Sequence, residues 1–157
     1  FKQKTAYEIV DCDWSSDVCS SDLVKSFITR PSPTMQMPAP GYYEITGVSY
    51  SGHGRIAKVE VSADGGKSWA LAALSGPVLP KAITRFRMPW NWSGQPVVLQ
   101  SRATDEAGNV QPTRWKLIAE RGEPRGTPPV GAFPMEHVNC ICSWAVDAKG
   151  AVSHVYA

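Results

Sequence analysis

Hydrophobic and polar residues alternate along much of the chain with the period of two that is typical of strands with one buried face. In residues 57–62, Ala57, Val59 and Val61 take one parity and polar residues take the other. Similar patterns, or runs rich in β-branched and aromatic residues, predict further strands over 24–30, 42–50, 69–74, 85–90, 97–103, 115–121, 137–146 and 151–156. No stretch of about ten residues shows the apolar face of a helix.

Turn-forming residues separate these strands at short intervals. Residues 31–40 are rich in proline and lack the backbone donors of a ladder, and a second loop rich in glycine and proline spans 122–134. A tight turn is predicted at Asp64–Gly66, another at Glu106–Asn109, and the last hairpin closes at Lys149 and Gly150. Short strands at this spacing predict an all-β fold, an immunoglobulin-like (E-set) β-sandwich.

The composition is that of one domain with few charges. The chain has 157 residues, of which 19% are charged, below the roughly 25% of ordinary globular chains. The formal charge is +2 and no block of Lys or Arg is present, which argues against a nucleic-acid partner. No apolar run reaches the roughly 18 residues of a membrane span, and no basic segment followed by an apolar one opens the chain, so we expect neither a span nor an export signal in it.

Residues 2–23, KQKTAYEIVDCDWSSDVCSSDL, follow neither the strand period nor the helix period. Two parts of this segment, KQKTAYEI and DWSSDVCSSDL, closely resemble the in-frame translation of the fixed parts of a short-read sequencing adapter. We therefore expect residues 1–23 to be an artefact or a disordered tail without a fold, and the domain to comprise 24–157. Since residues 1–23 hold two lysines and five acidic residues, residues 24–157 carry 14 basic and 9 acidic residues and a charge of +5.

Ser62, Asp64, Gly66 and Trp69 fit the S-x-D-x-G-x-x-W pattern, which resembles the Asp box of sialidase-type propellers. The pattern suits a tight turn, because the carboxylate can accept backbone hydrogen bonds, glycine permits a positive φ and tryptophan packs beneath the hairpin. A propeller repeats such a motif in several blades, whereas this chain holds one copy. We therefore predict a structural turn rather than a sialidase site.

Cys140 and Cys142, with His137 nearby, have residue types that bind zinc. Residues at i and i+2 of a strand share a face, but a tetrahedral site needs four ligands, and no second pair with metal-ligand spacing is present. Two buried apolar thiols are the favoured interpretation. His53 lies between two glycines without a nucleophile motif, so we expect a turn residue and no catalytic or metal site.

The tryptophans supply more large apolar surface than the centre of a small sandwich needs. Trp90 and Trp92 share one strand parity, and together with Trp69, Trp115 and Trp144 they either complete the core or anchor an interface. Arg102 is a further candidate for a strand edge or an interface. A sugar-binding platform of exposed tryptophans is another possibility, and spacing alone does not separate these roles.

Four runs of the chain carry a family resemblance through their combination and order. They are GRIAKVEVSADGGKSWALAAL (54–74), LPKAITRFRMPWNW (79–92), LQSRATDEAGNVQPTRW (99–115) and SWAVDAKGAVSHVYA (143–157). Together they closely resemble the C-terminal dimerisation domain of sulfite-oxidase-family molybdenum enzymes, and within that family most resemble the molybdenum subunits of bacterial sulfane or sulfite dehydrogenases. The resemblance covers 24–157.

The resemblance implies an immunoglobulin-like sandwich that follows a molybdopterin-binding catalytic domain and stabilises a homodimer beside it. In such enzymes the molybdenum, held by a pterin dithiolene and one cysteine, takes part in oxygen-atom transfer to reduced sulfur, and electrons pass to a cytochrome c. The family places the catalytic cysteine upstream, so neither Cys140 nor Cys142 takes its role. The resemblance therefore implies a periplasmic parent enzyme, and a fragment that binds no cofactor and is inactive by itself.

Some family members place an arginine of the last strands near the substrate anion. In this chain the corresponding residues, 139–144, offer Ser143 instead, so the role is not carried over, and Arg102 and Arg114 are expected to be ordinary strand-edge or interface charges. The alternative hypothesis, from a different class, is a free-standing β-sandwich that binds carbohydrate through exposed tryptophans.

Overall fold

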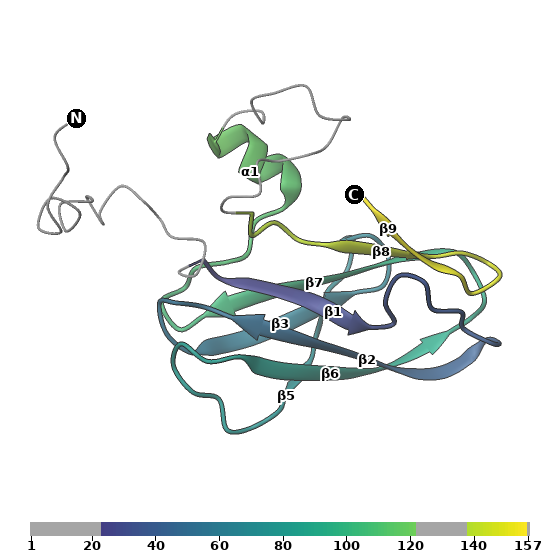
Figure 1. The fold of residues 1–157 in the computed structure, drawn as a ribbon, viewed down its shortest axis with the longest axis horizontal. Coiled ribbons are helices and arrows are strands. Elements are labelled where there is room, and N and C mark those ends of the chain that lie inside the picture. The colour runs from purple at the N-terminus through teal and green to yellow at the C-terminus, as the bar shows by residue number, and fades with distance from the viewer. Residues whose placement is uncertain (1–22, 122–137, 157) are drawn as a thin grey trace, which may run out of the picture.

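The computed structural model describes residues 23–121 and 138–156, which form two antiparallel β-sheets packed face to face (Figure 1). The four-stranded sheet contains, in spatial order, β1 (Lys25–Arg30), β2 (Gly41–Tyr50), β6 (Thr84–Trp92) and β5 (Ala73–Leu74). The five-stranded sheet contains β4 (Ala70–Leu71), β3 (Ile56–Ser62), β7 (Val97–Asp105), β8 (Ser143–Val146) and β9 (Val152–Val155). One helix, α1 (Arg114–Arg121), is present in the described part of the chain. The predicted all-β sandwich is confirmed.

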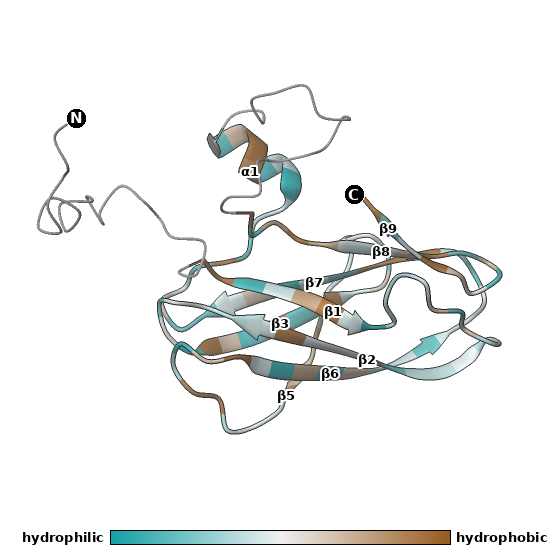
Figure 2. Ribbon diagram, viewed as in Figure 1, coloured by the Kyte–Doolittle hydropathy of each residue, from teal (hydrophilic) through white to brown (hydrophobic). Residues whose placement is uncertain are grey.

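The core lies between the two sheets and is built from alternate residues of the strands. On β6, Phe86 is 1% exposed and Trp92 is 2% exposed, whereas Arg85 and Arg87 point outward, as the alternation predicts. Figure 2 shows the same alternation of hydrophobic and hydrophilic residues along the strands. Gly47 lies opposite Phe86 in the ladder, and a side-chain carbon at that glycine would overlap the phenyl ring. A close-packed interior thus requires glycine at this point of β2.

The predicted face of β3 is wrong at one position. Ala57 is exposed and Ile56 is buried, although the alternation assigns Ala57 to the buried face. The ladder with β7 shifts register between Ile56 and Lys58, so one extra residue is accommodated there as a β-bulge. A bulge reverses the parity on one side of it, which sequence alternation alone does not reveal.

The predicted strand 69–74 is divided between the two sheets. β4 pairs with β3 in the five-stranded sheet, while β5 pairs with β6 in the four-stranded sheet. Ala72, between them, is 4% exposed and donates its N–H to the carbonyl of Val59 at 2.9 Å. The predicted hairpin pairing with β3 is therefore correct for β4 and wrong for β5, because the chain crosses to the other sheet between them.

The strand predicted at 115–121 is wrong, because these residues form helix α1. The Thr113 hydroxyl accepts a hydrogen bond from the N–H of Lys116 at 3.2 Å, which caps the first turn. Lys116 and Glu120 approach to 3.8 Å at the i,i+4 spacing, and Leu117 is buried. Capping and the helix-favouring Lys, Leu, Ala and Glu residues outweigh the β-propensity of the neighbouring tryptophan and isoleucine.

The last predicted hairpin is confirmed in its ladder, with β8 paired to β9, but it begins at Ser143 rather than at residue 137. His137 lies outside the described residues, as do the adapter-like segment up to residue 22 and the loop 122–134. Among the described residues, no helix has the length and apolar character to cross a membrane.

Candidate interaction surfaces

The turn between β3 and β4 is held together by the side chains that the sequence assigns to it. The Ser62 hydroxyl donates to Asp64 Oδ1 at 2.7 Å and accepts from the N–H of Gly66 at 2.8 Å. The Asp64 carboxylate also accepts from two later backbone N–H groups of the turn, both at 2.9 Å. Trp69 Nε1 donates to the Gly66 carbonyl at 3.0 Å. All four residues therefore meet in one hydrogen-bonded turn.

The Asp64 carboxylate braces this turn as an anion. Hydrogen bonds from the hydroxyl and the N–H of Ser68 hold the pKa of Asp64 well below its ordinary value. Gly66 has φ +88° and lies directly over the side chain of Gln100 on β7, so that a Cβ there would lie 2.8 Å from Gln100 Oε1. The turn thus covers part of the outer face of the five-stranded sheet and occupies the lone pairs of Asp64.

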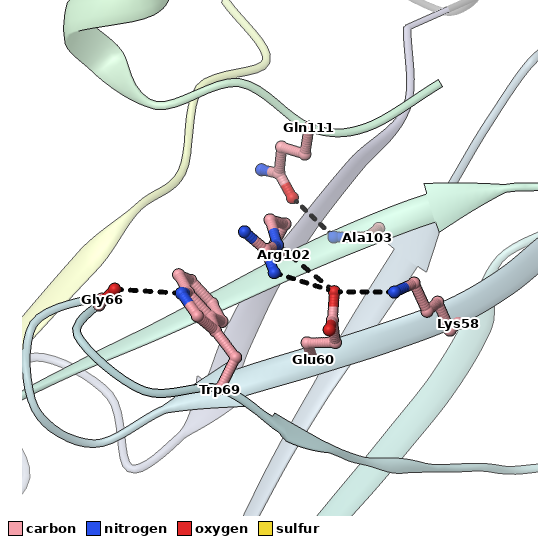
Figure 3. A network of polar contacts seen from close by, with 7 residues as sticks. All are labelled: Lys58, Glu60, Gly66, Trp69, Arg102, Ala103 and Gln111. Atoms are coloured by element: carbon pink, nitrogen blue, oxygen red, sulfur yellow. Dashed lines mark hydrogen bonds and ion pairs between the residues drawn. The ribbon is translucent and has the colours of Figure 1, made fainter. Parts of the chain in front are cut away.

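Arg102 joins the outer side chains of β3 and β7 next to this turn (Figure 3). Its Nε and Nη2 donate to Glu60 Oε2 at 3.3 and 3.0 Å, and Lys58 Nζ lies 3.3 Å from the same oxygen. The guanidinium carbon lies 4.3 Å from the ring centroid of Trp69. Burial raises the pKa of Glu60, but hydrogen bonds from Arg102 and Lys58 outweigh it and leave the pKa lowered. The charges of this network are therefore paired within the domain.

Gln111 is a structural residue that the sequence did not single out. Its Oε1 accepts from the N–H and the hydroxyl of Ser26 at 2.9 and 2.7 Å, and from the N–H of Ala103 at 3.3 Å. Its Nε2 donates to the carbonyls of Ser26 and Cys140 at 3.1 and 3.2 Å. One buried amide thus connects β1, β7 and the segment before β8. The D-x-x-G-N-x-Q-P pattern at 105–112 contains this residue, and it is the sequence feature from which the role of Gln111 could have been suspected.

Asp105, the first residue of the 105–112 pattern, is a second buried residue that holds a turn together by hydrogen bonds. Its carboxylate accepts from the N–H groups of Ala107 and Asn109, the side chain of Asn109 and the hydroxyl of Ser51 at 2.7 to 3.1 Å. Burial raises the pKa of Asp105, but the hydrogen bonds from Asn109 and Ser51 outweigh burial and leave the pKa lowered. The N–H of exposed His53 donates to Ser51 Oγ at 3.1 Å, which places His53 in a turn.

The tryptophans predicted as interface residues lie in different environments. Trp92 is 2% exposed and donates its Nε1 to the carbonyl of Gln95 at 2.8 Å. Trp90 is half-buried and packs against the core, with its ring centroid 6.4 Å from that of Tyr43. These two side chains complete the core, one of the roles that the sequence left open. Trp115 on α1 is 71% exposed and is accessible on the surface.

Cys140 and Cys142 are half-buried, unpaired thiols in the segment before β8. Burial raises the pKa of both thiols, and the nearby Arg114 partly opposes this effect at Cys140. Metal ligation requires the thiolate, which this environment disfavours. Across 23–121 and 138–156, no group of three or more His, Cys, Asp or Glu residues is placed to hold a metal ion. Both thiols are therefore half-buried side chains that lie outside any cluster of metal-ligating residues in the described parts of the chain.

Comparison with known proteins identifies relatives among molybdenum oxidoreductases. Sulfite oxidase from Gallus gallus is 33% identical over 100 residues, which cover 57% of this chain and 20% of the relative. A nitrate reductase (NADH) from Hordeum vulgare is 35% identical over 109 residues, covering 59% of this chain and 12% of the relative. The chain thus spans a fifth or less of the length of these two curated relatives.

A solved structure is similar over most of the chain. The sulfane dehydrogenase SoxCD from Paracoccus pantotrophus is 44% identical, with a TM-score of 0.76, and the match covers 85% of this chain and 32% of that chain. The model of the family described as the Mo-co oxidoreductase dimerisation domain matches residues 18–123. The resemblance predicted from the four sequence runs is therefore confirmed, and the chain belongs to the Mo-co oxidoreductase dimerisation domain family.

Proposed function

We propose that this chain is the dimerisation domain of a molybdopterin-dependent sulfite or sulfane dehydrogenase and that it joins two copies of that enzyme beside their catalytic domains. The observation that carries the proposal is the 44% identity to the sulfane dehydrogenase over 85% of the chain. Identity of this level exceeds the 33% and 35% found for the sulfite oxidase and the nitrate reductase. A reduced sulfur compound is therefore the substrate class that we assign to the parent enzyme.

The arrangement of polar residues supports a structural role for the domain itself. The buried amide of Gln111 and the buried carboxylate of Asp105 use their hydrogen-bonding groups to join strands and turns. The Asp64 carboxylate and the Arg102 guanidinium likewise have partners inside the domain. Groups held in this way stabilise a fold rather than transfer protons, because their lone pairs and donors are occupied.

The remaining parts of the proposal concern the parent enzyme. A molybdopterin-binding domain upstream of residue 24 holds the cofactor and supplies the cysteine ligand, so this chain alone binds no cofactor and oxidises no substrate. The parent enzyme is a homodimer in the periplasm and delivers its electrons to a cytochrome c. These statements rest on the relationship to the sulfane dehydrogenase and on the dimerisation domain family.

The alternative of a free-standing carbohydrate-binding module is not favoured. Such a module needs neighbouring aromatic rings that are open to a sugar. Trp92 is buried and Trp90 is half-buried against the core, so the pair with shared strand parity does not form a platform.

Sedimentation velocity of the chain over a wide range of concentrations tests the proposal. We expect a reversible or stable dimer, and no oxidation of sulfite with ferricyanide as acceptor. A parallel experiment on residues 24–157 should give the same dimer, because the adapter-like segment takes no part in it. A chain that stays monomeric at the highest attainable concentration, or that oxidises sulfite by itself, would contradict the proposal.

A further inference from the structure

We propose that the outer face of the four-stranded sheet is the surface through which two copies of this chain pair, about a two-fold axis that runs along the strands between β2 and β6. The inference rests on the proposed dimer and names the surface that forms it. It depends on three features of the face: its mixture of apolar and charged side chains, the absence of ion pairs to Glu44, Arg85 and Arg87 among the described residues, and the position of its opposite charges.

The apolar part of this face includes two neighbouring side chains, on β1 and β2, that lie in one row with an arginine of β6. Phe27 of β1 is paired in register with Val48 of β2, and Val48 is paired with Arg85 of β6. Phe27 is 44% exposed although it lies within a strand of the sandwich, and Val48 is half-buried. Tyr42, at the other end of β2, is 84% exposed. A row of one exposed aromatic, one half-buried aliphatic and one arginine side chain has the composition of an interface centre.

Three charged side chains at the centre of the face have no ion-pair partner among the described residues. Glu44 of β2 and Arg85 and Arg87 of β6 are exposed on this side of the sheet. Among the described residues, none of these three side chains makes an ion pair or a hydrogen bond. Glu44 lies opposite Pro89 in the ladder, so Arg87 is its diagonal neighbour on the same face. A face that carries both signs of charge without pairing them has charges available to a second copy.

The strand order makes such a pairing symmetric. β2 and β6 are the two central strands and, with 10 and 9 residues, the longest strands of their sheet (Figure 1). Identical surfaces that pack face to face are related by a two-fold axis in the interface plane. An axis along the strands, midway between β2 and β6, places β2 of one copy over β6 of the other, and β1 over β5. All four strands then overlap.

The same axis brings opposite charges together. Glu44 comes to lie over the segment of the second copy that holds Pro89, and the partner's Arg87 is one same-face step away, about 6.6 Å along the strand. Stacked sheets lie about 10 Å apart, a gap that a glutamate and an arginine side chain span together. Symmetry repeats the contact, so two identical ion pairs flank the axis. Val48 meanwhile lies over the aliphatic stem of the partner's Arg85.

The opposite face of the sandwich is less suited to this role. The turn at 62–69 covers part of the five-stranded sheet, and the charges of Lys58, Glu60 and Arg102 are paired with one another. Exposed Trp115 belongs to α1, outside both sheets, where Lys116 and Glu120 are also paired. Neither surface combines unpaired opposite charges with an exposed apolar row.

A charge-swap experiment tests the proposed face. We expect Glu44→Arg and Arg87→Glu, each alone, to raise the dimer dissociation constant by at least about tenfold, because each places like charges at both symmetric contacts. The double variant Glu44→Arg/Arg87→Glu should return to within about threefold of the unmodified chain. Sedimentation equilibrium measures the constants, and urea unfolding of the monomers should show unchanged stability, because both side chains point outward.

Two matched controls complete the experiment. Lys58→Glu makes the same change in net charge as Arg87→Glu on the opposite face, and Trp115→Ala removes the exposed ring of α1; neither should change the dimer dissociation constant by more than about threefold. The choice of face is overturned if neither single charge reversal changes the dimer dissociation constant, or if Lys58→Glu or Trp115→Ala abolishes the dimer instead. Either result leaves the proposed dimer itself intact. A chain that is monomeric throughout overturns the proposed dimer itself.

Discussion

The two outer faces of the sandwich differ in whether their charged side chains form ion pairs within the domain. On the five-stranded sheet, Arg102 and Lys58 both bond to Glu60, and Arg102 also stacks on Trp69 (Figure 3). On the four-stranded sheet, the arginines of β6 and Glu44 lie exposed without such partners among the described residues. A face whose polar groups are satisfied internally contributes to the stability of one chain. A face whose charges have no partner in the same chain can instead form ion pairs with another molecule.

The largest loss of stability is expected at Gln111, whose buried amide joins the two sheets instead of lying on either outer face. Replacement by alanine removes five hydrogen bonds, among them the one that the buried backbone N–H of Ser26 donates. We expect Gln111→Ala to lower the free energy of unfolding by about 3 kcal/mol, measured by urea denaturation at concentrations at which the chain is monomeric.

The neighbouring Val110 provides a control for this prediction. It is 49% exposed, so Val110→Ala should change the free energy of unfolding by less than about 0.5 kcal/mol. Equal effects of the two substitutions would show that the amide network does not hold β1 to β7.

A smaller effect is expected for Arg102, which is partly exposed. Arg102→Ala removes both hydrogen bonds to Glu60 and the stacking on Trp69, and should cost about 1 kcal/mol of unfolding free energy. Arg87→Ala, on the other face, should cost less than about 0.5 kcal/mol in the monomer because that exposed side chain has no ion-pair partner among the described residues. If the two arginine variants unfold at the same urea concentration, the ion pairs of the five-stranded sheet do not add to the free energy of unfolding.

The smallest expected effect is a pH dependence that belongs to one face. Because pairing leaves the pKa of folded Glu60 below its ordinary value of 4.5, the ionised carboxylate stabilises the fold above pH 4.5, and this contribution is lost as the pH falls through the folded-state pKa. The difference in unfolding free energy between the unmodified chain and Glu60→Gln should therefore be less than about 1 kcal/mol at pH 7 and shrink toward zero below pH 4.5.

Much of the fold could be predicted from local patterns. Alternation located β6 and assigned Phe86 inward and Arg87 outward, because a half-buried strand imposes a period of two on its own residues. The alternation failed at Ala57, where a bulge changes the parity, and at 115–121, where a capped helix holds residues that also favour strands. Both failures depend on a neighbouring strand or on a capping contact that the residue type does not encode by itself.

The residues of the candidate sites likewise differ in whether the sequence alone could identify them. The turn residues Ser62, Asp64, Gly66 and Trp69 were identifiable because their contacts lie within eight consecutive residues. Gln111 was missed because its partners Ser26 and Cys140 lie 85 and 29 residues away. A glutamine in a loop shows its role only when the strands that it connects are in place.

The sequence by itself therefore determined the class of the fold, most strands, the turn at 62–69 and the family, since each of these is written in short runs of neighbouring residues. Only the tertiary structure decided which tryptophans are core, which buried amides hold the sheets together, and which outer face keeps its charges unpaired. The physical reason is that burial and pairing depend on register between segments far apart in the chain, and a shift of one residue moves a side chain from one face of a sheet to the other.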